Sequence, residues 1–237
     1  MSMQNQQQPF LTFNVNLLGA GSFENVPGYP EEESQEDQKL LWQPVPLKSS
    51  WVLWEQLSGT TWSTKKVVTF NTAQEFWRIW NGVPQPSELL DNKRYFRENQ
   101  GGGSQAIDAI MLFRDGISPE WEDAANSQGG HFQILLKPTA GGAQIDEYWN
   151  NLVLGMVGET MEGADEITGV RLVDKLSQKT KVTDCIRLEL WYHSKASNSA
   201  VGMLRRSMEK CLTMRLDGTQ GTAFKGEAIQ DKKHNGK

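Results

Sequence analysis

Short apolar segments with strand-like composition follow one another directly along the chain, and this arrangement limits the possible folds more than any other feature. Strands that succeed one another without a helix between them pair antiparallel, whereas a doubly wound parallel sheet needs strand and helix to alternate. The chain is therefore predicted to have an α+β fold, a curved antiparallel β-sheet with three long helices on its convex face. Its concave face is left free to bind a ligand. The segments expected as strands are 51–57, 65–70, 109–114, 132–137, 170–176 and 185–192.

The first predicted helix has a clear start signal. Thr72 and Glu75 form a capping box, in which each side chain accepts a hydrogen bond from the backbone of the other. A second helix is expected from about Ile145 to Val157, and a third from Ser197 or Asn198. The apolar residues of the first helix recur at helical spacing, namely Ala73, Phe76, Trp77 and Trp80. The third helix is expected to turn Val201, Leu204, Met208 and Cys211 inward, and the tryptophans interpreted as core residues are Trp51, Trp54, Trp80 and Trp149.

The composition changes along the chain and predicts one domain between two tails. Residues 1–40 are rich in polar residues and hold six acidic side chains against one basic one, so they are expected to form a flexible acidic tail. Residues 41–216 are expected to form a single domain. Within it, 83–109 is expected to be a long loop or insertion because it contains two prolines and a run of three glycines. Residues 217–237 are expected to form a flexible C-terminal segment.

Composition also disfavours several classes of function. The whole chain and its first 40 residues each carry a net charge of −5, so the remainder is balanced and is not expected to coat nucleic acid through bulk positive charge. Two cysteines and three scattered histidines are too few for a disulfide framework or a metal enzyme. No apolar run is long enough for a membrane span, and the N-terminus does not resemble a secretory signal. The cysteine content fits a reducing cytoplasmic or nuclear setting, and a cytoplasmic protein without a cofactor is expected. Phosphate-binding glycine loops, nucleophile elbows and metalloprotease motifs are absent from the sequence, which disfavours an enzyme.

One loop segment combines features that suggest a binding site. Residues 115–123 have the glycine and proline content of a loop, yet Trp121 stands directly before two acids, Glu122 and Asp123. An exposed indole beside a carboxylate suits a flat, positively charged heterocycle that offers two adjacent N–H donors. The alternative is a tryptophan lid that packs on the core beside solvated acids, and the spacing alone favours this alternative.

The segment Trp121–Gly130, WEDAANSQGG, resembles the central signature of the translation initiation factor 4E family, which binds the 5′ cap of messenger RNA. The likeness covers roughly residues 44–216, and its order and spacing make a chance match improbable. The other segments that resemble the family are 46–54 (PLKSSWVLW), Thr61-Trp62, 70–77 (FNTAQEFW), Tyr148-Trp149, Gly158-Glu159 and 188–191.

The resemblance implies a protein without enzymatic activity that recognises a 7-methylguanosine base. It implies that Trp62 and Trp121 sandwich the base, which methylation at N7 makes cationic and therefore attractive to indole faces. Glu122 would accept hydrogen bonds from the guanine N1–H and the exocyclic amine. Trp191 would lie near the methyl group.

Positive charge is concentrated between residues 171 and 187, which hold five bases and two acids. Charge alone favours a solvated hairpin. The resemblance implies instead that this hairpin binds the cap phosphates through Arg187 and Lys175, together with Lys179 or Lys181. Residues 187, 189 and 191 are expected to share one strand face because side chains alternate along a strand.

The resemblance also implies a second binding surface, on the helix-covered side. There an initiation scaffold or a repressor would lay a short helical motif, in a helix-in-groove mode, and the chain is expected to be a monomer that binds capped messenger RNA and no membrane. The pattern alone leaves Trp77 equally able to pack inward. The residues implied for this surface are Trp77, Ala73, Val45, Pro46 and Leu154.

Two departures from the family pattern suggest a divergent, protozoan-type paralogue. His131 occupies a place where family members often carry an arginine, and a histidine is largely neutral at pH 7, which is expected to weaken phosphate binding. The 83–109 region is also longer than in compact members.

The leading hypothesis is a cap-binding initiation factor that recruits a scaffold. One alternative is a cap-binding translational repressor that does not recruit the scaffold, and another, disfavoured because no nucleophile or metal cluster supports it, is a hydrolase of nucleotides or caps.

Overall fold

The computed structural model of the chain describes most of the predicted domain and part of the C-terminal segment. Some of the sequence-based predictions fall outside it, namely the tail at 1–40 and the candidate site residues Trp62, Lys179 and Lys181. The described residues are 43–59, 63–91, 93–98, 101–177, 184–215, 218–221, 224 and 228–234.

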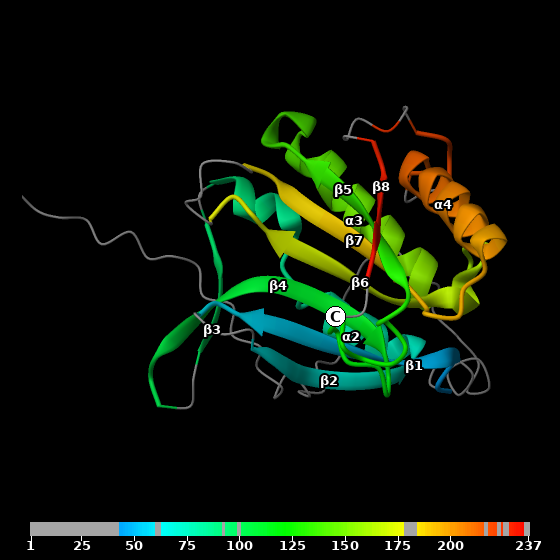
Figure 1. Cartoon of the computed structure of the whole chain (residues 1–237). Coiled ribbons are helices and arrows are strands. Elements are labelled where there is room, and N and C mark those ends of the chain that lie inside the picture. Colours follow the sequence, from blue (N-terminus) through cyan, green and yellow to red (C-terminus); the bar gives the residue numbers. More distant parts are fainter. Residues whose placement is uncertain are drawn as a thin grey trace, which may run out of the picture.

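Within these ranges the strands form one curved, eight-stranded sheet whose pairs are all antiparallel (Figure 1). The order is β2-β1-β4-β6-β7-β5-β8, and β3 pairs with β4 outside this order. The predicted α+β class and antiparallel sheet are confirmed. The strands are β1 (Pro46–Leu57), β2 (Thr64–Thr72), β3 (Tyr95–Glu98), β4 (Ser104–Arg114), β5 (Gly130–Leu136), β6 (Ile167–Asp174), β7 (Ile186–Tyr192) and β8 (Gln230–Lys233).

Helices cover one face of this sheet, as predicted, although α2 is only eight residues long whereas α3 and α4 have 16 each. The capping box is present: Glu75 N–H donates to Thr72 Oγ1 at 3.2 Å, and Thr72 N–H donates to Glu75 Oε2 at 3.3 Å. None of the described helices is both long and apolar enough to cross a membrane. The helices are α2 (Ala73–Trp80), α3 (Gly142–Val157) and α4 (Asn198–Thr213), with 3₁₀ turns η1 (Pro86–Asp91), η2 (Pro138–Ala140) and η3 (Ala164–Glu166).

The two faces of the sheet carry different side chains because successive residues of a strand point to opposite sides. On β7, Leu188 and Leu190 belong to the main core between sheet and helices, whereas Trp191 belongs to a small cluster on the other face. That cluster also contains Met111 and Phe113 of β4. The concave face therefore has its own apolar floor, separate from the main core.

Most of the expected core residues are buried. Trp51, Trp80 and Trp149 are 0%, 4% and 0% exposed. Trp54 differs, since it is half-buried and packs against the small cluster on the concave face. On α4 the buried stripe continues to Leu212, and Cys211 is only half-buried.

Two segments that the sequence predicts as loops contain strands. The 83–109 region holds η1, β3 and the first half of β4. Its strand β3 is only four residues long and pairs locally with β4, so it leaves little periodic signal. The 217–237 segment holds β8, whose sequence QDKK has no apolar alternation. It is a strand because it pairs with the edge of β5, which its own composition does not reveal.

Replacing Thr72 by alanine removes the oxygen that accepts the Glu75 N–H. The free energy of unfolding, measured by urea denaturation, is expected to fall by about 1 kcal/mol, the usual effect of losing such a cap. The exposed Thr139 in η2 provides the control. Thr139→Ala should change stability by less than about 0.5 kcal/mol, and an equal effect of the two substitutions would contradict a role for the cap.

Candidate functional site

The loop between β4 and β5, residues 115–129, begins next to a residue that is held in place by several contacts. Arg114, the last residue of β4, donates to the carbonyls of Ala164 and Ile167 at 2.8 and 2.7 Å. Its guanidinium also lies over the ring of Trp51, 4.8 Å from the centroid. These contacts anchor the start of the loop to the buried core on the helix-covered side.

Hydrogen bonds within the loop give it a defined shape. Asn126 is fully buried, and its side-chain amide donates to the carbonyls of Ser118 and Glu120, both at 2.9 Å. The carboxylate of Asp123 accepts from the backbone N–H groups of Ser118 and Ala125 at 2.8 and 2.9 Å. Because the loop satisfies its own backbone groups, it can hold neighbouring side chains away from the core.

Trp121 and Glu122 are the side chains that this loop presents outward. The indole of Trp121 is 56% exposed, and Glu122 is exposed and makes no hydrogen bond or ion pair with the described part of the chain. A tryptophan lid would bury its ring against the core, so the exposed indole argues against the lid alternative. An exposed aromatic face and an adjacent carboxylate with free lone pairs are the groups that a cationic heterocycle needs.

The start of β2 lies against the same loop. Thr64 Oγ1 donates to Glu120 Oε1 at 3.2 Å, and Lys66 Nζ lies 3.4 Å from Asp115 Oδ1. Glu120 directly precedes Trp121, and Thr64 follows Trp62 by two positions. The structure thus brings the sequence neighbours of both predicted sandwich tryptophans together, while Trp62 itself lies outside the described residues.

Two histidines fill the space between Trp121 and the sheet, and one of them was not expected from the sequence. His234, which follows β8, lies with its ring 5.4 Å from that of Trp121 at 21° and 4.4 Å from that of Trp191 at 59°. His131 of β5 stacks on Trp191 at 5.6 Å and 19°. Its Nδ1 is 2.8 Å from Nε2 of His234. Trp191, implied to lie near the methyl group, is consequently only 1% exposed and is covered by these rings and by Phe113.

His131 is uncharged at neutral pH, as the sequence predicts. Burial lowers its pKa to about 4, even though the nearby carboxylate of Glu189 opposes this shift. The side chain is 5% exposed and is engaged with His234 and Trp191. It therefore packs within the site and does not offer a positive charge to a phosphate.

Arg187, Glu189 and Trp191 lie on one face of β7, as alternation predicts. Glu189 is 1% exposed; it accepts from Trp191 Nε1 at 2.9 Å and lies 2.7 Å from Arg187 Nε and 3.4 Å from Arg171 Nη1. Burial alone would raise the pKa of Glu189, but the two arginines lower it to about 2. Glu189 is therefore charged, and it links the aromatic cluster to a basic group of side chains.

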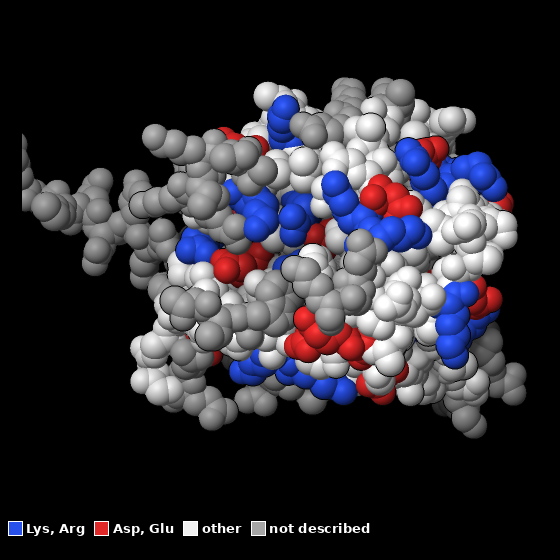
Figure 2. Space-filling model, viewed as in Figure 1, with Lys and Arg blue, Asp and Glu red and all other residues white. Residues whose placement is uncertain are grey.

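Lys175 belongs to the same basic region. Burial lowers its pKa, and the charges of Arg187 and Arg171 lower it further, which puts the ammonium within their field. Figure 2 shows that Lys and Arg side chains gather on this face of the molecule, with acidic side chains below them in that view. The side chain of Arg187 remains 25% exposed, so it can still be reached from solvent. Lys179 and Lys181 lie outside the described residues.

The residues implied for partner binding lie on the opposite side of the sheet. Trp77 and Val45 are 46% and 56% exposed, while the neighbouring Phe76 packs in the core. The N–H of Ala73 donates to the carbonyl of Val45 at 2.9 Å, which holds the start of α2 against the residues before β1. Pro46 is exposed beside them, and Leu154 on α3 is half-buried. The structure thus groups Val45, Pro46 and Ala73 around the first turn of α2, with Trp77 one turn along.

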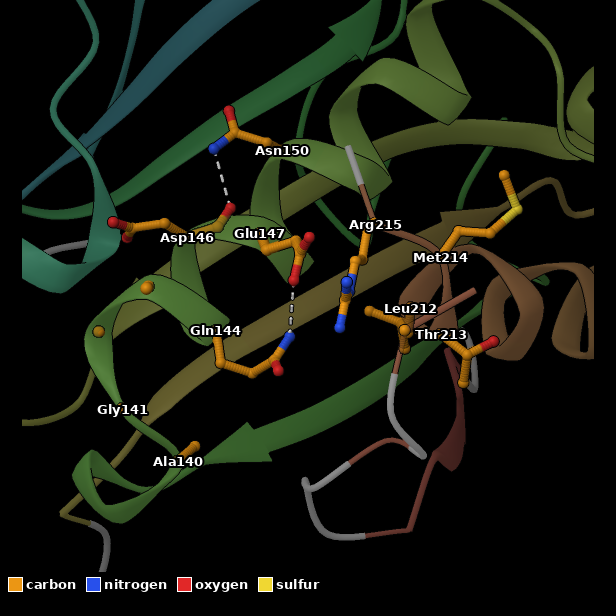
Figure 3. A pocket seen from close by; sticks show the side chains of 13 residues that line it. Ala140, Gly141, Gln144, Asp146, Glu147, Asn150, Leu212, Thr213, Met214 and Arg215 are labelled. Carbon is orange, nitrogen blue, oxygen red and sulfur yellow. Dashed lines mark hydrogen bonds between the residues drawn. The ribbon is translucent and has the colours of Figure 1, made fainter. Parts of the chain in front are cut away.

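A separate hollow of about 790 Å³ lies between the start of α3 and the end of α4 (Figure 3). Its acidic and amide side chains already have partners within the protein. Gln144 donates to Glu147 at 3.1 Å, and Asp146 accepts from the backbone and the hydroxyl of Ser87 at 2.7 and 2.6 Å. None of the predicted site residues lines it. The exposed loop tryptophan is therefore the better candidate for a binding site.

Comparisons with known proteins identify relatives of this chain. A family model described as "Eukaryotic initiation factor 4E" matches residues 46–237. The chain is 31% identical over 183 residues to eukaryotic translation initiation factor 4E of Saccharomyces cerevisiae, covering 64% of this chain and 78% of the yeast protein. It is 30% identical over 148 residues to the factor of Dictyostelium discoideum, covering 57% of this chain and 52% of that one. The chain thus spans about half the length of the latter relative.

Solved structures of similar fold include eIF4E-3 proteins of two nematodes. A Caenorhabditis elegans eIF4E-3 in complex with the 4E-binding protein Mextli and a cap analog has a TM-score of 0.58 and 22% identity, covering 81% of this chain and 94% of that one. Ascaris suum eIF4E-3 with an m2,2,7G cap has a TM-score of 0.57 and 21% identity, covering 79% and 98%. At these identities the likeness supports the fold. Because the family model extends from β1 through β8, the chain belongs to the eukaryotic initiation factor 4E family.

Proposed function

We propose that this chain binds the 7-methylguanosine 5′ cap of messenger RNA through the loop at residues 115–129. One observation carries the proposal: a hydrogen-bonded loop holds the Trp121 indole in solvent directly beside Glu122, whose carboxylate makes no hydrogen bond or ion pair with the described residues. Exposing a large aromatic ring in this way forgoes the free energy that its burial would contribute. A ligand that stacks on the ring recovers it. The family contains initiation factors and no enzymes, so the hydrolase alternative is set aside.

The chemistry of the methylated base matches these two side chains. Methylation at N7 gives guanine a positive charge, and the face of an indole is the strongest cation–π partner among side chains. Stacking of a base on an aromatic side chain is worth about 1–3 kcal/mol. Glu122 supplies two carboxylate oxygens that can accept the guanine N1–H and the exocyclic amine. The carboxylate selects guanine by its edge, and the indole senses the methyl group through the charge.

Trp62 is proposed as the second plate of the sandwich. The hydrogen bond between Thr64 and Glu120 supports this role, since it joins the start of β2 to the residue just before Trp121. Trp191 is buried below His131 and His234. Its proposed part is to form the floor of the site, and direct contact with the methyl group would require His234 to move.

The cap phosphates are proposed to bind at the basic region of β6, β7 and their connection, through Arg187, Lys175 and Lys179. Arg187 is the best supported because it is partly exposed and is held by the buried Glu189. With His131 neutral, this region carries the positive charge of the concave face near the aromatic cluster. Such contacts are local and sensitive to salt.

The surface around Trp77 and Val45 is proposed to bind an initiation scaffold or a repressor that carries a short helical motif. The apolar side chains of Val45 and Trp77 are both exposed there, and Phe76 and Trp80 of the same helix as Trp77 stack on each other at 5.7 Å and 17°. Exposed apolar residues on a rigid helix suit an amphipathic helix of a partner. We further propose that the chain acts as a monomer in the cytoplasm.

Titration of intrinsic tryptophan fluorescence with 7-methyl-GTP and with GTP tests the cap site. The methylated nucleotide should quench strongly, and GTP should bind far more weakly because its base lacks the positive charge. Trp121→Ala is expected to weaken 7-methyl-GTP binding by about 1–3 kcal/mol, or roughly 5- to 150-fold. Glu122→Gln should weaken it by a similar amount, because a charge-assisted pair is worth about 1.5–3 kcal/mol.

Trp77→Ala is the matched control, since it removes an exposed tryptophan from the other side of the sheet and should leave nucleotide binding unchanged. Equal affinities for the two nucleotides would remove methyl recognition from the proposal. Normal binding by Trp121→Ala would remove the assigned stacking role.

Trp77→Ala and Trp121→Ala also test the partner surface, with their roles as test variant and control exchanged. A synthetic helical peptide taken from a 4E-binding protein should bind the wild type, and Trp77→Ala should weaken it by about 2 kcal/mol or more, roughly 30-fold, because such an exposed tryptophan is a typical hot spot. Trp121→Ala should bind the peptide as the wild type does. If Trp77→Ala keeps full peptide affinity, the surface is misassigned. If the wild type binds the nucleotide but no such peptide, the repressor without scaffold recruitment becomes the better description.

A further inference from the structure

The C-terminal segment ends, within the described residues, in a buried imidazole. The strand β8 is mostly exposed, but His234 immediately after it is 3% exposed. Among the described strands, β8 pairs with the edge of β5 alone, from Gly130↔Lys233 to Gln133↔Gln230. A short polar edge strand has little apolar surface of its own to bury, so the contacts of His234 are the main apolar anchor at this end of the strand.

His234 is hydrogen-bonded to the loop that carries Trp121. Its backbone N–H donates to the carbonyl of Gly129 at 3.1 Å, and its Nδ1 lies 3.0 Å from the carbonyl oxygen of Asn126. Asn126 in turn donates to the carbonyl of Glu120, the residue before Trp121. A continuous set of hydrogen bonds therefore runs from His234 to the neighbour of the stacking indole.

These contacts determine the tautomers of both histidines. A carbonyl oxygen only accepts, so Nδ1 of His234 must carry the hydrogen, and its Nε2 in the neutral ring is an acceptor. Nδ1 of His131, 2.8 Å away, must then carry a hydrogen and donate it. The order is His131 Nδ1–H to His234 Nε2, and His234 Nδ1–H to the Asn126 carbonyl. Each ring is fixed in its plane by the bond that it makes to the next group.

The ring of His234 also touches the indole of Trp121 directly. The two planes are within 21° of parallel at a centroid distance of 5.4 Å, while more than half of the indole surface remains open. On its other side the imidazole meets Trp191 at 4.4 Å. The histidine thus fills the corner between the buried floor and the exposed plate and limits the angles that Trp121 can adopt.

We propose that His234 is a positioning residue of the cap site, which fastens the loop at 115–129 from the C-terminal segment and holds Trp121 in the orientation that stacks on the base. The inference rests on the proposed cap-binding function of Trp121. It adds that a residue from the far end of the chain, outside the predicted domain, determines how much of the protein is ready to bind. Apparent affinity falls in proportion to the fraction of molecules in the competent state.

The test combines nucleotide affinity with a direct report on Trp121. In protein labelled with 5-fluorotryptophan, the ¹⁹F signal of Trp121 is identified by its loss in Trp121→Phe. In His234→Ala this signal should shift and average, and 7-methyl-GTP should bind roughly tenfold more weakly if Trp121 is correctly oriented about a tenth of the time. His234→Asn, which keeps a donor for the Asn126 carbonyl but lacks the ring, should recover part of the affinity. Lys233→Gln, an exposed neighbour on the same strand, is the control and should match the wild type.

The outcomes separate this inference from the proposed function. If the wild type does not bind 7-methyl-GTP, the proposed function fails, and the ¹⁹F signal still shows whether His234 orders Trp121. If His234→Ala keeps the wild-type signal and affinity, the positioning role is overturned. If His234→Ala binds more tightly, it is also overturned, because His234 then competes with the base for the indole. If His234→Ala and Lys233→Gln lower the melting temperature equally, any effect belongs to β8 as a whole. This result would also overturn the specific role of His234.

Acidification provides a second readout. Burial lowers the pKa of both histidines below the ordinary value of 6.5, to about 4 for His131, so each favours the uncharged form in the folded state. The contribution of the pair to stability is therefore complete above pH 6.5 and is lost as pH falls from 6.5 towards 4. An added proton on Nε2 of His234 would set two donors against each other as long as His131 keeps its hydrogen on Nδ1. The charged groups around the pair are Glu189, which favours protonation, and Arg171 and Arg187, which oppose it.

The wild-type ¹⁹F signal of Trp121 should accordingly move towards that of His234→Ala as pH is lowered from 7 to about 4, whereas the signal of His234→Ala should stay near its starting position. A wild-type signal that does not move over this range would contradict the coupling of the imidazole pair to Trp121.

Discussion

The separation of the two faces of one antiparallel sheet is the constraint on which the rest of this structure depends. Successive side chains of a strand point to opposite faces of the sheet. A residue whose side chain enters the core beneath the helices therefore places the side chain of the next residue on the concave face. On β7 this places Leu188 and Leu190 in the main core, and it places Glu189 and Trp191 opposite them. A shift of one residue in strand register would exchange the two sets and bury the charged row beneath the helices. The large core therefore fixes the position of the ligand-facing side chains.

The concave face needs its own means of excluding water, because no described helix covers it. A small apolar cluster and the two histidine rings close its floor, and a hydrogen-bonded loop closes one end. The loop is held by the buried amide of Asn126 and the carboxylate of Asp123, which leaves the Trp121 ring with few packing partners. Polar groups inside the loop thus determine its shape, and the ring of Trp121 remains available to a ligand.

The strands and helices that position the site can be predicted from local sequence patterns, whereas the residues that complete the site cannot. The capping box at Thr72 and the alternation on β7 are short-range signals, and both are reproduced in the structure. The strand β8 and the role of His234 have no such signal, because the strand is polar and the contact of His234 with His131 spans 103 positions. A sequence shows which residues alternate, but it does not show which distant edge a polar segment will pair with. The likeness of residues 121–130 to a known family identified the loop, since spacing alone favoured a buried ring.

The buried charge of Glu189 explains how the site combines an apolar floor with a basic group of side chains. A carboxylate that is 1% exposed is stable only when it is paired and hydrogen-bonded, and here Arg171, Arg187 and the Trp191 indole N–H provide that. Two arginines against one carboxylate leave a charge of +1, so the group is still attractive to an anion although Arg187 is already paired. The same carboxylate holds the arginine and the indole at fixed positions on β7. The basic group and the apolar floor are therefore coupled through one acid, and losing its charge would remove the carboxylate that both arginines contact.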